Sequence, residues 1–347
     1  NLDTLIVAAP SRDNTSRLVS RGWDETFEVN PAGDRSHDSH DTQRLMRGVI
    51  AGLDTSGYSA PAYEAVLDSR VLPGSGLSSS AALEISLVGI HEALNDSEIP
   101  PLERARVGRF AENEYIGKPS GLMDQTAVSV GGCVAIDFSD PAEPRYHQIA
   151  LDFQRSNHQL AIVNTGGSHA DLTDQYAAVP QEMHAVAKAL GVSHLAETTK
   201  KDLLQQLNAV RKHAGDRAVL RAFHFFDEQD RVSALTDAVD SRHTDRVLTL
   251  MNDSGESSWM MLQNVYPDNG GKDQSLALGL TLTREYFHER GAVGACRVHG
   301  GGFAGTILAV VPQDLFAEYR TVMDRAFGEH ATQALHVRTH GLIYGAL

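Results

Sequence analysis

The chain has 347 residues, of which 41% are hydrophobic and 22% are charged, and its formal net charge is −15. This length and balance are typical of a globular protein with one large domain or two ordinary ones, and they exclude a disordered or fibrous chain. The acidic charge argues against a nucleic-acid-binding surface, and no apolar run reaches the roughly 18 residues that a membrane-spanning helix needs.

The first part of the chain predicts a small antiparallel sheet followed by a helix. Three apolar segments with turns between them have strand-like composition: Leu5–Ala9, Arg17–Val19 and Thr26–Val29. The segment Thr42–Leu53 repeats apolar residues at helical spacing. Residues 31–41, which lie between the last strand and this helix, are polar. They include His37, Asp38, His40 and Asp41, for which a solvated loop is a better interpretation than a metal cluster, because nothing nearby completes a ligand set.

The stretch Pro73–Ala82 reads Pro-Gly-Ser-Gly-Leu-Ser-Ser-Ser-Ala-Ala. It follows a strand-like segment, Ala65–Asp68, and precedes a helical apolar face that runs from Leu83 to Leu94. Glycines let the backbone approach a bulky ligand, serines supply hydroxyls, and the N-terminus of a helix carries about half a positive charge. The stretch therefore predicts a phosphate-binding loop at a helix N-terminus.

This loop differs from the two common nucleotide-binding motifs. A P-loop needs a lysine after its second glycine, and no lysine follows Gly76. A dinucleotide-binding motif needs a third glycine, and Ser79 stands at that position. The structural alternative is a serine-rich turn that caps a helix.

A further helix is predicted from Leu102 to Tyr115, with Glu112 near its end. The loop after it, Gly117–Gln125, contains Asp124 next to Leu122 and Met123. Such a loop places a carboxylate in partly apolar surroundings, where its pKa can be tuned for catalysis. The alternatives are a helix-capping aspartate at Asp124 and a solvated glutamate at Glu112.

The composition changes near residue 165, where strand-like Gln159–Asn164 gives way to a predominantly helical region that extends from Leu172 to about His288. We therefore expect two domains, residues 1–165 and 166–347. Near the end of the chain, three consecutive glycines, Gly300–Gly302, precede a strand over Thr306–Val311. Such glycines allow close approach of the backbone to a ligand or to another loop.

The sequence His299–Gly302 also matches the HGGG oxyanion motif of some esterases. Those enzymes need a Gly-x-Ser-x-Gly nucleophile motif, which this sequence lacks, and their HGGG loop precedes the nucleophile. A serine hydrolase is therefore not favoured.

Three stretches in this order resemble the motifs of the GHMP small-molecule kinases: Gly74–Glu84, Ala111–Asn113 with Gly121–Gln125, and Arg297–Gly305. The form Gly-Leu-Met-Asp-Gln is similar to that of the galactokinases in particular, as is Asn164 followed by Tyr176. The resemblance covers about residues 4–340. It implies an α+β, two-domain fold with the active site in the cleft between the domains.

The resemblance also implies an activity: ATP-dependent phosphorylation of the anomeric hydroxyl of galactose, giving galactose 1-phosphate. The loop residues would wrap the triphosphate of ATP: Gly74, Ser75, Gly76, Leu77, Ser78, Ser79 and Ser80. Ser80 and Glu112 would hold Mg²⁺, an ion that prefers oxygen ligands and keeps several waters.

For the sugar, the resemblance implies that Asp124 faces the O1 hydroxyl as the catalytic base or as an orienting carboxylate. Tyr176 would contact the sugar, and Gly300, Gly301 and Gly302 would line the site.

The sequence departs from the family pattern in two places. The family carries a Gly-Arg-x-Asn…Gly-Glu-His-x-Asp segment near its N-terminus, whose arginine pairs with the catalytic aspartate and whose other side chains bind the sugar. We expect a segment before Asn1 to supply it, and we expect little or no kinase activity from a chain that begins at Asn1. The other departure concerns loop shape only: Pro73 directly precedes Gly74, and His299 stands where the family often has threonine.

Three functions stay open at this point: a galactokinase, a kinase of the same family that acts on another sugar such as N-acetylgalactosamine, and a non-catalytic regulator that binds sugar and ATP. The complete Ser78–Ala82 segment and the presence of Asp124 favour an enzyme. With two cysteines far apart and no basic and apolar signal segment at the start, we expect a monomeric cytoplasmic protein without nucleic-acid or membrane partners.

Overall fold

The structure is a computed structural model that describes residues 2–34, 36, 38–71, 77–118, 120–167 and 172–346. The chain forms two compact units. Unit 1 comprises Asn1–Asp137, Pro144–Gln148 and Val337–Leu347, and unit 2 comprises Phe138–Glu143 and Ile149–His336. The units interleave along the chain, whereas the change in composition places a single boundary near residue 165. The division into domains at residue 165 therefore stays a prediction.

Unit 1 contains a four-stranded sheet with the strand order β1-β4-β2-β3. Its strands are β1 (Thr4–Pro10), β2 (Ser16–Ser20), β3 (Thr26–Val29) and β4 (Tyr63–Ser69). The central pair, β2 and β4, runs parallel, and the two outer pairs run antiparallel. Side chains alternate between the faces of the sheet, so Leu18 and Phe27 are buried while Val7 and Val66 are more than half exposed.

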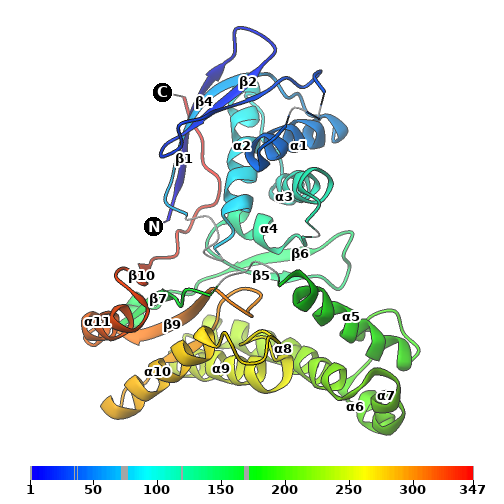
Figure 1. Ribbon diagram of the computed structural model, residues 1–347, viewed down its shortest axis with the longest axis vertical. Helices are drawn as coiled ribbons and strands as arrows, with labels where there is room; N and C mark the ends of the chain where they lie inside the picture. Colours follow the sequence, from blue (N-terminus) through cyan, green and yellow to red (C-terminus); the bar gives the residue numbers. More distant parts are fainter. Residues whose placement is uncertain are drawn as a thin grey trace. The chain divides into compact units, whose positions relative to one another are not determined.

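Helices pack against the buried face of this sheet (Figure 1). They are α1 (Asp41–Thr55) and α2 (Ser79–Asn95), and α3 (Pro101–Ala111) packs on both of these helices. A π-helical turn, η2 (Glu112–Ile116), continues α3, and α4 (Met123–Val130) follows. The core combines sheet residues such as Leu18 and Tyr63 with Met46 of α1, Leu87 of α2 and Val107 of α3. The strands and helices predicted up to Tyr115 are confirmed within a few residues at each end.

The polar segment before α1 is held by structural contacts. The carboxylate of Asp38 is buried in an ion pair with Arg47, whose guanidinium also donates to the Asn30 carbonyl oxygen at 2.8 Å. The His40 side chain accepts a hydrogen bond from the Thr42 backbone at 3.1 Å and caps α1. These contacts favour the loop interpretation of this segment, while His37 lies outside the described residues.

The last residues of the chain return to unit 1, where they run beside α2 and β1 (Figure 1). An ion pair of 3.1 Å joins Arg338 to Asp3. Strands β5 (Cys133–Asp137) and β6 (Arg145–Ile149) form a two-stranded sheet. In the sequence they stand on either side of Phe138–Glu143, which belongs to unit 2. This return of the C-terminus explains why the units interleave in sequence.

Unit 2 contains an antiparallel sheet with the order β10-β7-β9-β8. Its strands are β7 (His158–Asn164), β8 (Ala295–Val298), β9 (Thr306–Pro312) and β10 (Thr332–Leu335). The core of this sheet includes buried residues of α10 (Ser275–Arg290) and α11 (Phe316–Phe327), among them Leu280 and Tyr319. The strands at β7 and β9 match the prediction, and β10 and α11 were not predicted.

The predicted helical region from residue 172 to 288 is confirmed. Its α-helices before α10 are α5 (Thr173–Ala189), α6 (Lys200–Gln205), α7 (Leu207–Ala214), α8 (Asp216–Asp240) and α9 (Thr244–Ser257). Short helical turns also occur in unit 2: η3 (Gln154–Ser156), η4 (Leu195–Glu197) and η5 (Ser258–Leu262). Among the described residues, no helix combines the length and the apolarity that crossing a membrane requires.

Candidate active site

The first turn of α2 forms one end of the candidate site. The helix begins at Ser79, within the stretch predicted as the phosphate-binding loop, and its N-cap residue is Ser78. Ser78 has a φ of 56°, and its side chain makes no capping hydrogen bond. The first turn of α2 carries no acidic side chain, so its N–H groups and the helix dipole are available to an anion. Gly74, Ser75 and Gly76 lie outside the described residues, whereas Leu77 to Ser80 are described.

The Ser78 hydroxyl donates instead to Asp124, at 2.5 Å from Oδ2. Asp124 lies in the first turn of α4, whose N-cap residue is Leu122, so it is not a capping aspartate. Its side chain is exposed, in contrast to the partly apolar surroundings that the sequence suggested: Leu122 is buried, but Met123 is 59% exposed. The structure thus joins the loop serine to the predicted catalytic carboxylate.

Two turns of helix bring the predicted metal ligands together. The Ser80 hydroxyl, in the first turn of α2, lies 2.9 Å from Glu112 Oε1. Glu112 is the first residue of the π-helical turn η2, and π-helical turns occur often at functional sites. The Lys118 ammonium group contacts the same carboxylate oxygen at 2.6 Å. Burial alone would raise the pKa of Glu112, but hydrogen bonds from Lys118, Ser120 and Ser80 lower it below its ordinary value.

Gln125 forms a hydrogen bond with the second carboxylate oxygen of Glu112. The Gln125 amide nitrogen donates to Glu112 Oε2 at 3.0 Å and to Glu84 Oε2 at 3.0 Å. All three side chains are buried. Burial raises the pKa of Glu84 to about 8, so this carboxyl group carries a proton at neutral pH.

Sequence reasoning assigned no role to Lys118, Gln125 or Glu84, although all three lie within or beside the motifs. An acidic residue in the apolar run Ala81–Ile85 was the available signal for Glu84.

In unit 2, Tyr176 packs against the predicted glycine turn. The Tyr176 hydroxyl donates to the Gly302 carbonyl oxygen at 2.8 Å, and its ring meets Phe303 edge to face at 5.2 Å between centroids. A Cβ atom on Gly301 would lie 2.8 Å from the Tyr176 ring, so only glycine fits there. Gly300 and Gly302 have positive φ angles of 68° and 80°.

Asn264, a buried residue to which sequence reasoning assigned no role, holds this turn. Its side-chain nitrogen donates to the Gly301 carbonyl oxygen at 3.0 Å. A single asparagine after a helical segment offers no sequence signal for such a contact. The structure therefore places Tyr176 against the glycine turn, and the roles of these residues in binding stay predictions.

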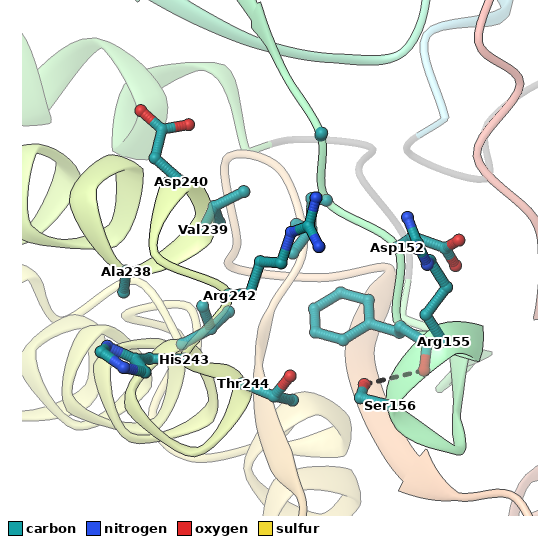
Figure 2. Close-up of a pocket in the computed structure, with 13 residues that line it drawn as sticks. Asp152, Arg155, Ser156, Ala238, Val239, Asp240, Arg242, His243 and Thr244 are labelled. Atoms are coloured by element: carbon teal, nitrogen blue, oxygen red, sulfur yellow. Dashed lines mark hydrogen bonds between the residues drawn. The ribbon is translucent and has the colours of Figure 1, made fainter.

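A separate pocket of about 550 Å³ lies on unit 2. Figure 2 shows Arg242 reaching from the turn between α8 and α9 toward the wall that carries Asp152 and Arg155. Both charge signs line this pocket, since Asp240 and Asp152 balance the two arginines. None of the site residues predicted from the sequence lies in it.

Comparison with known proteins places these features in a family. The family described as GHMP kinases N terminal domain matches residues 44–132. A galactokinase of Mycobacterium tuberculosis is 30% identical over 286 residues, which cover 80% of this chain and 72% of that protein. A galactokinase of Thermotoga petrophila is 25% identical over 285 residues, covering 82% of this chain and 75% of that protein.

Solved structures share the fold. The crystal structure of Lactococcus lactis galactokinase complexed with galactose superposes with a TM-score of 0.79 at 22% identity, covering 98% of this chain and 86% of that one. A mevalonate kinase structure superposes with a TM-score of 0.62 at 14% identity, covering 96% and 88%. At these identities the likeness concerns the fold alone, and it confirms the predicted α+β architecture.

Proposed function

Because this chain belongs to the galactokinase family of the GHMP kinases, we propose that it transfers the terminal phosphoryl group of ATP to the anomeric hydroxyl of galactose, giving galactose 1-phosphate and ADP. It is a sugar kinase, a phosphotransferase with an alcohol acceptor. One observation carries the assignment of the chemistry to this chain: at the N-terminus of α2, the N-cap residue Ser78 donates its hydroxyl to Asp124 and Ser80 donates its hydroxyl to Glu112. Asp124, which is proposed to serve the acceptor, and Glu112, which is proposed to bind the cation, therefore both lie at the N-terminus of α2.

ATP is the phosphoryl donor, and the N-terminus of α2 is the proposed place for its phosphates. Free N–H groups and the positive end of the helix dipole stabilise phosphate oxygens there. Leu77, Ser78, Ser79 and Ser80 are proposed phosphate contacts, together with Gly74, Ser75 and Gly76 of the preceding loop. Phosphoryl transfer depends mainly on positioning and charge neutralisation, which such a helix end can supply.

Ser80 and Glu112 fit Mg²⁺. They offer a hydroxyl oxygen and an ionised carboxylate oxygen 2.9 Å apart, which is the hard-oxygen donor type that this ion prefers. Two protein ligands are sufficient, because Mg²⁺ in kinases takes its remaining ligands from water and substrate phosphates. When bound, the ion would neutralise charge that develops on the transferred phosphoryl group.

Asp124 is the proposed catalytic residue, in contact with the O1 hydroxyl of the sugar. Its Oδ2 accepts the hydrogen bond from Ser78, so that Oδ1 can face the acceptor. In the reaction a bond forms between O1 and the terminal phosphorus, the bond from that phosphorus to the ADP oxygen breaks, and the O1 proton passes to Asp124. The hydrogen bond from the Ser78 hydroxyl holds the Asp124 carboxylate in place before this transfer.

Tyr176, Gly300 and Gly301 are proposed sugar contacts, since the aromatic ring and the glycine turn form one packed group in unit 2. A monomeric state and a cytoplasmic location are also proposed, on the composition of the sequence alone.

The proposal is tested by measuring ADP release from ATP with galactose, N-acetylgalactosamine or mevalonate as acceptor, each with and without Mg²⁺. Turnover that needs Mg²⁺ and is fastest with galactose is expected. Faster turnover on N-acetylgalactosamine would move the assignment to another sugar. Binding of ATP and galactose without any turnover would favour a regulator.

A further inference from the structure

Three elements of unit 1 carry the groups that the proposed reaction needs. Ser80 lies on α2, Glu112 lies at the start of η2 directly after α3, and Asp124 lies on α4. These elements are joined only by loops, so some buried contact must fix their separation. The described residues contain one group of side chains that touches all three elements at once, formed by Glu84, Gln125 and Glu112.

Gln125 occupies the centre of this group. Its side chain is 1% exposed, and its amide nitrogen donates one hydrogen to Glu84 of α2 and the other to Glu112 of η2, each at 3.0 Å. The opposite orientation of the amide would point its oxygen at the ionised carboxylate of Glu112, so the contact with Glu112 decides how the amide lies. Since Gln125 directly follows Asp124 in the chain, anchoring Gln125 also fixes the turn that presents Asp124.

The structure makes room for this group at Gly108 of α3. A Cβ atom there would lie 2.9 Å from Glu84 Oε2 and 3.1 Å from Gln125 Cγ. Any larger residue would push the Glu84 and Gln125 side chains out of this position. The absence of a side chain at Gly108 therefore leaves room on α3 for the side chains of Glu84 and Gln125.

Ser80 and Lys118 contact Oε1 of Glu112, whereas Gln125 donates to Oε2. A hydrogen bond on Oε2 stops the carboxylate from rotating, so that Oε1 stays directed at Ser80. Glu84 completes the anchor, and in its neutral form it adds no negative charge beside Glu112.

We propose that Gln125 is a positioning residue for phosphoryl transfer: its amide, anchored on Glu84, orients the metal-binding carboxylate of Glu112 and holds the turn that carries Asp124. This inference rests on the proposed function, because it takes Glu112 as a ligand of Mg²⁺. Gln125 itself touches neither substrate nor metal. Residues that orient a metal ligand through hydrogen bonds typically change metal affinity by about ten- to a hundredfold when they are replaced.

The test compares Gln125→Met, which keeps the length of the side chain and removes both donors, with Gln159→Met, which makes the same change at a buried glutamine of unit 2. Two quantities are measured on the purified protein: Mn²⁺ binding by electron paramagnetic resonance, and the Mg²⁺ concentration that gives half-maximal ADP release. We expect Gln125→Met to weaken both by about ten- to a hundredfold and to lower kcat. Gln159→Met should stay within about twofold of the wild type in both quantities, because the amide of Gln159 donates to the backbone oxygens of Leu160 and Leu335 and not to a proposed metal ligand.

A double-mutant cycle separates positioning from a general effect on stability. In a Glu112→Gln background, Gln125→Met should cause no further loss of Mn²⁺ affinity, because the carboxylate that it orients is gone. Equal losses in both backgrounds, or a Gln125→Met protein with wild-type Mn²⁺ affinity, would overturn the proposal. If Gln125→Met does not fold, Gln125→Asn, whose shorter side chain cannot span both carboxyl groups, replaces it with the same expected result.

The same data distinguish failure of this inference from failure of the proposed function. A full-length wild-type protein that shows no Mg²⁺-dependent turnover on galactose contradicts the proposed function. An active wild type with an unimpaired Gln125→Met variant contradicts only the role of Gln125.

Discussion

The hydroxyl of Ser78 donates a hydrogen bond of 2.5 Å to the carboxylate of Asp124. This bond connects the residue that caps α2 to the first turn of α4, and it uses a hydroxyl that would ordinarily bond to the helix backbone. Ser78 thereby links the phosphate-binding end of α2 to the residue proposed to receive the proton of the acceptor.

Replacing Ser78 by alanine should lower kcat by about ten- to a hundredfold, because a hydrogen bond to a charged group contributes about 1.5–3 kcal/mol. The KM for ATP should change much less. Since Ser78 has a positive φ, Ser78→Gly is the matched variant: it removes the hydroxyl but relieves the backbone. Steady-state kinetics should show the same kcat loss in both variants, whereas a loss in Ser78→Ala alone would assign the effect to the backbone.

Lys118 contacts the Glu112 oxygen that Ser80 also contacts, where a metal ion would add a second positive charge. Its side chain is 62% exposed and can move aside without disturbing the core. Lys118→Met should therefore lower the Mg²⁺ concentration that gives half-maximal activity, by about two- to tenfold, because a competing cation is removed. Lys201→Met, an exposed lysine of unit 2, controls for the change in net charge. A higher Mg²⁺ requirement in Lys118→Met would contradict this account.

Tyr176→Phe keeps the ring that packs on Gly301 and Phe303 but removes the donor to the Gly302 carbonyl oxygen. The KM for galactose should rise several-fold, since the loss of such a bond costs about 1 kcal/mol and loosens the glycine turn. Tyr344→Phe is the control, because Tyr344 also donates to a backbone oxygen, that of Ser97, but in unit 1. An equal effect of both variants on the KM for galactose would show that Tyr176 has no special part in sugar binding.

Glu84 should make the folding stability depend on pH. Burial raises its pKa from 4.5 to about 8, so between these values the folded protein holds a proton that the unfolded chain has released. The free energy of unfolding contributed by this group is therefore complete at low pH and falls as the pH rises to about 8, by up to about 1.4 kcal/mol per pH unit.

Urea denaturation of the wild type and of Glu84→Gln at several pH values between about 5 and 8 isolates this contribution. Because Gln does not titrate, the stability of Glu84→Gln relative to the wild type should increase with pH. A difference that stays constant across this range would mean that Glu84 is ionised in the folded protein or is not buried.

Local signals predicted a large part of unit 1. The serine-rich stretch does lead into a helix, which starts at Ser79. The π-helical turn that carries Glu112 lies at the end of the helix predicted from Leu102 to Tyr115. These features depend on turn residues, capping and apolar spacing within one segment. That Ser80 and Glu112 lie together came only from the resemblance to a family, because no spacing rule predicts contacts between distant segments.

The contacts that depend on packing were not predictable in this way. Gln125 follows a predicted catalytic residue, yet only the meeting of α2, α3 and α4 shows that its amide joins two carboxyl groups. Asp124 proved to be exposed because its apolar neighbours point elsewhere: Leu122 enters the core and Met123 faces outward. Strands β6 and β10 are short and partly polar, and their sequences carry no alternating pattern strong enough to identify them.

The most direct test of the account is to compare Asp124→Asn with the wild type in two measurements, the rate of ADP release with galactose and the affinity for the Mg²⁺ complex of a non-hydrolysable ATP analogue. The account predicts that kcat falls by at least about a thousandfold while nucleotide affinity stays within a few-fold of the wild type, because Asp124 serves the acceptor and not the nucleotide. An Asp124→Asn protein that phosphorylates galactose at the wild-type rate would contradict it.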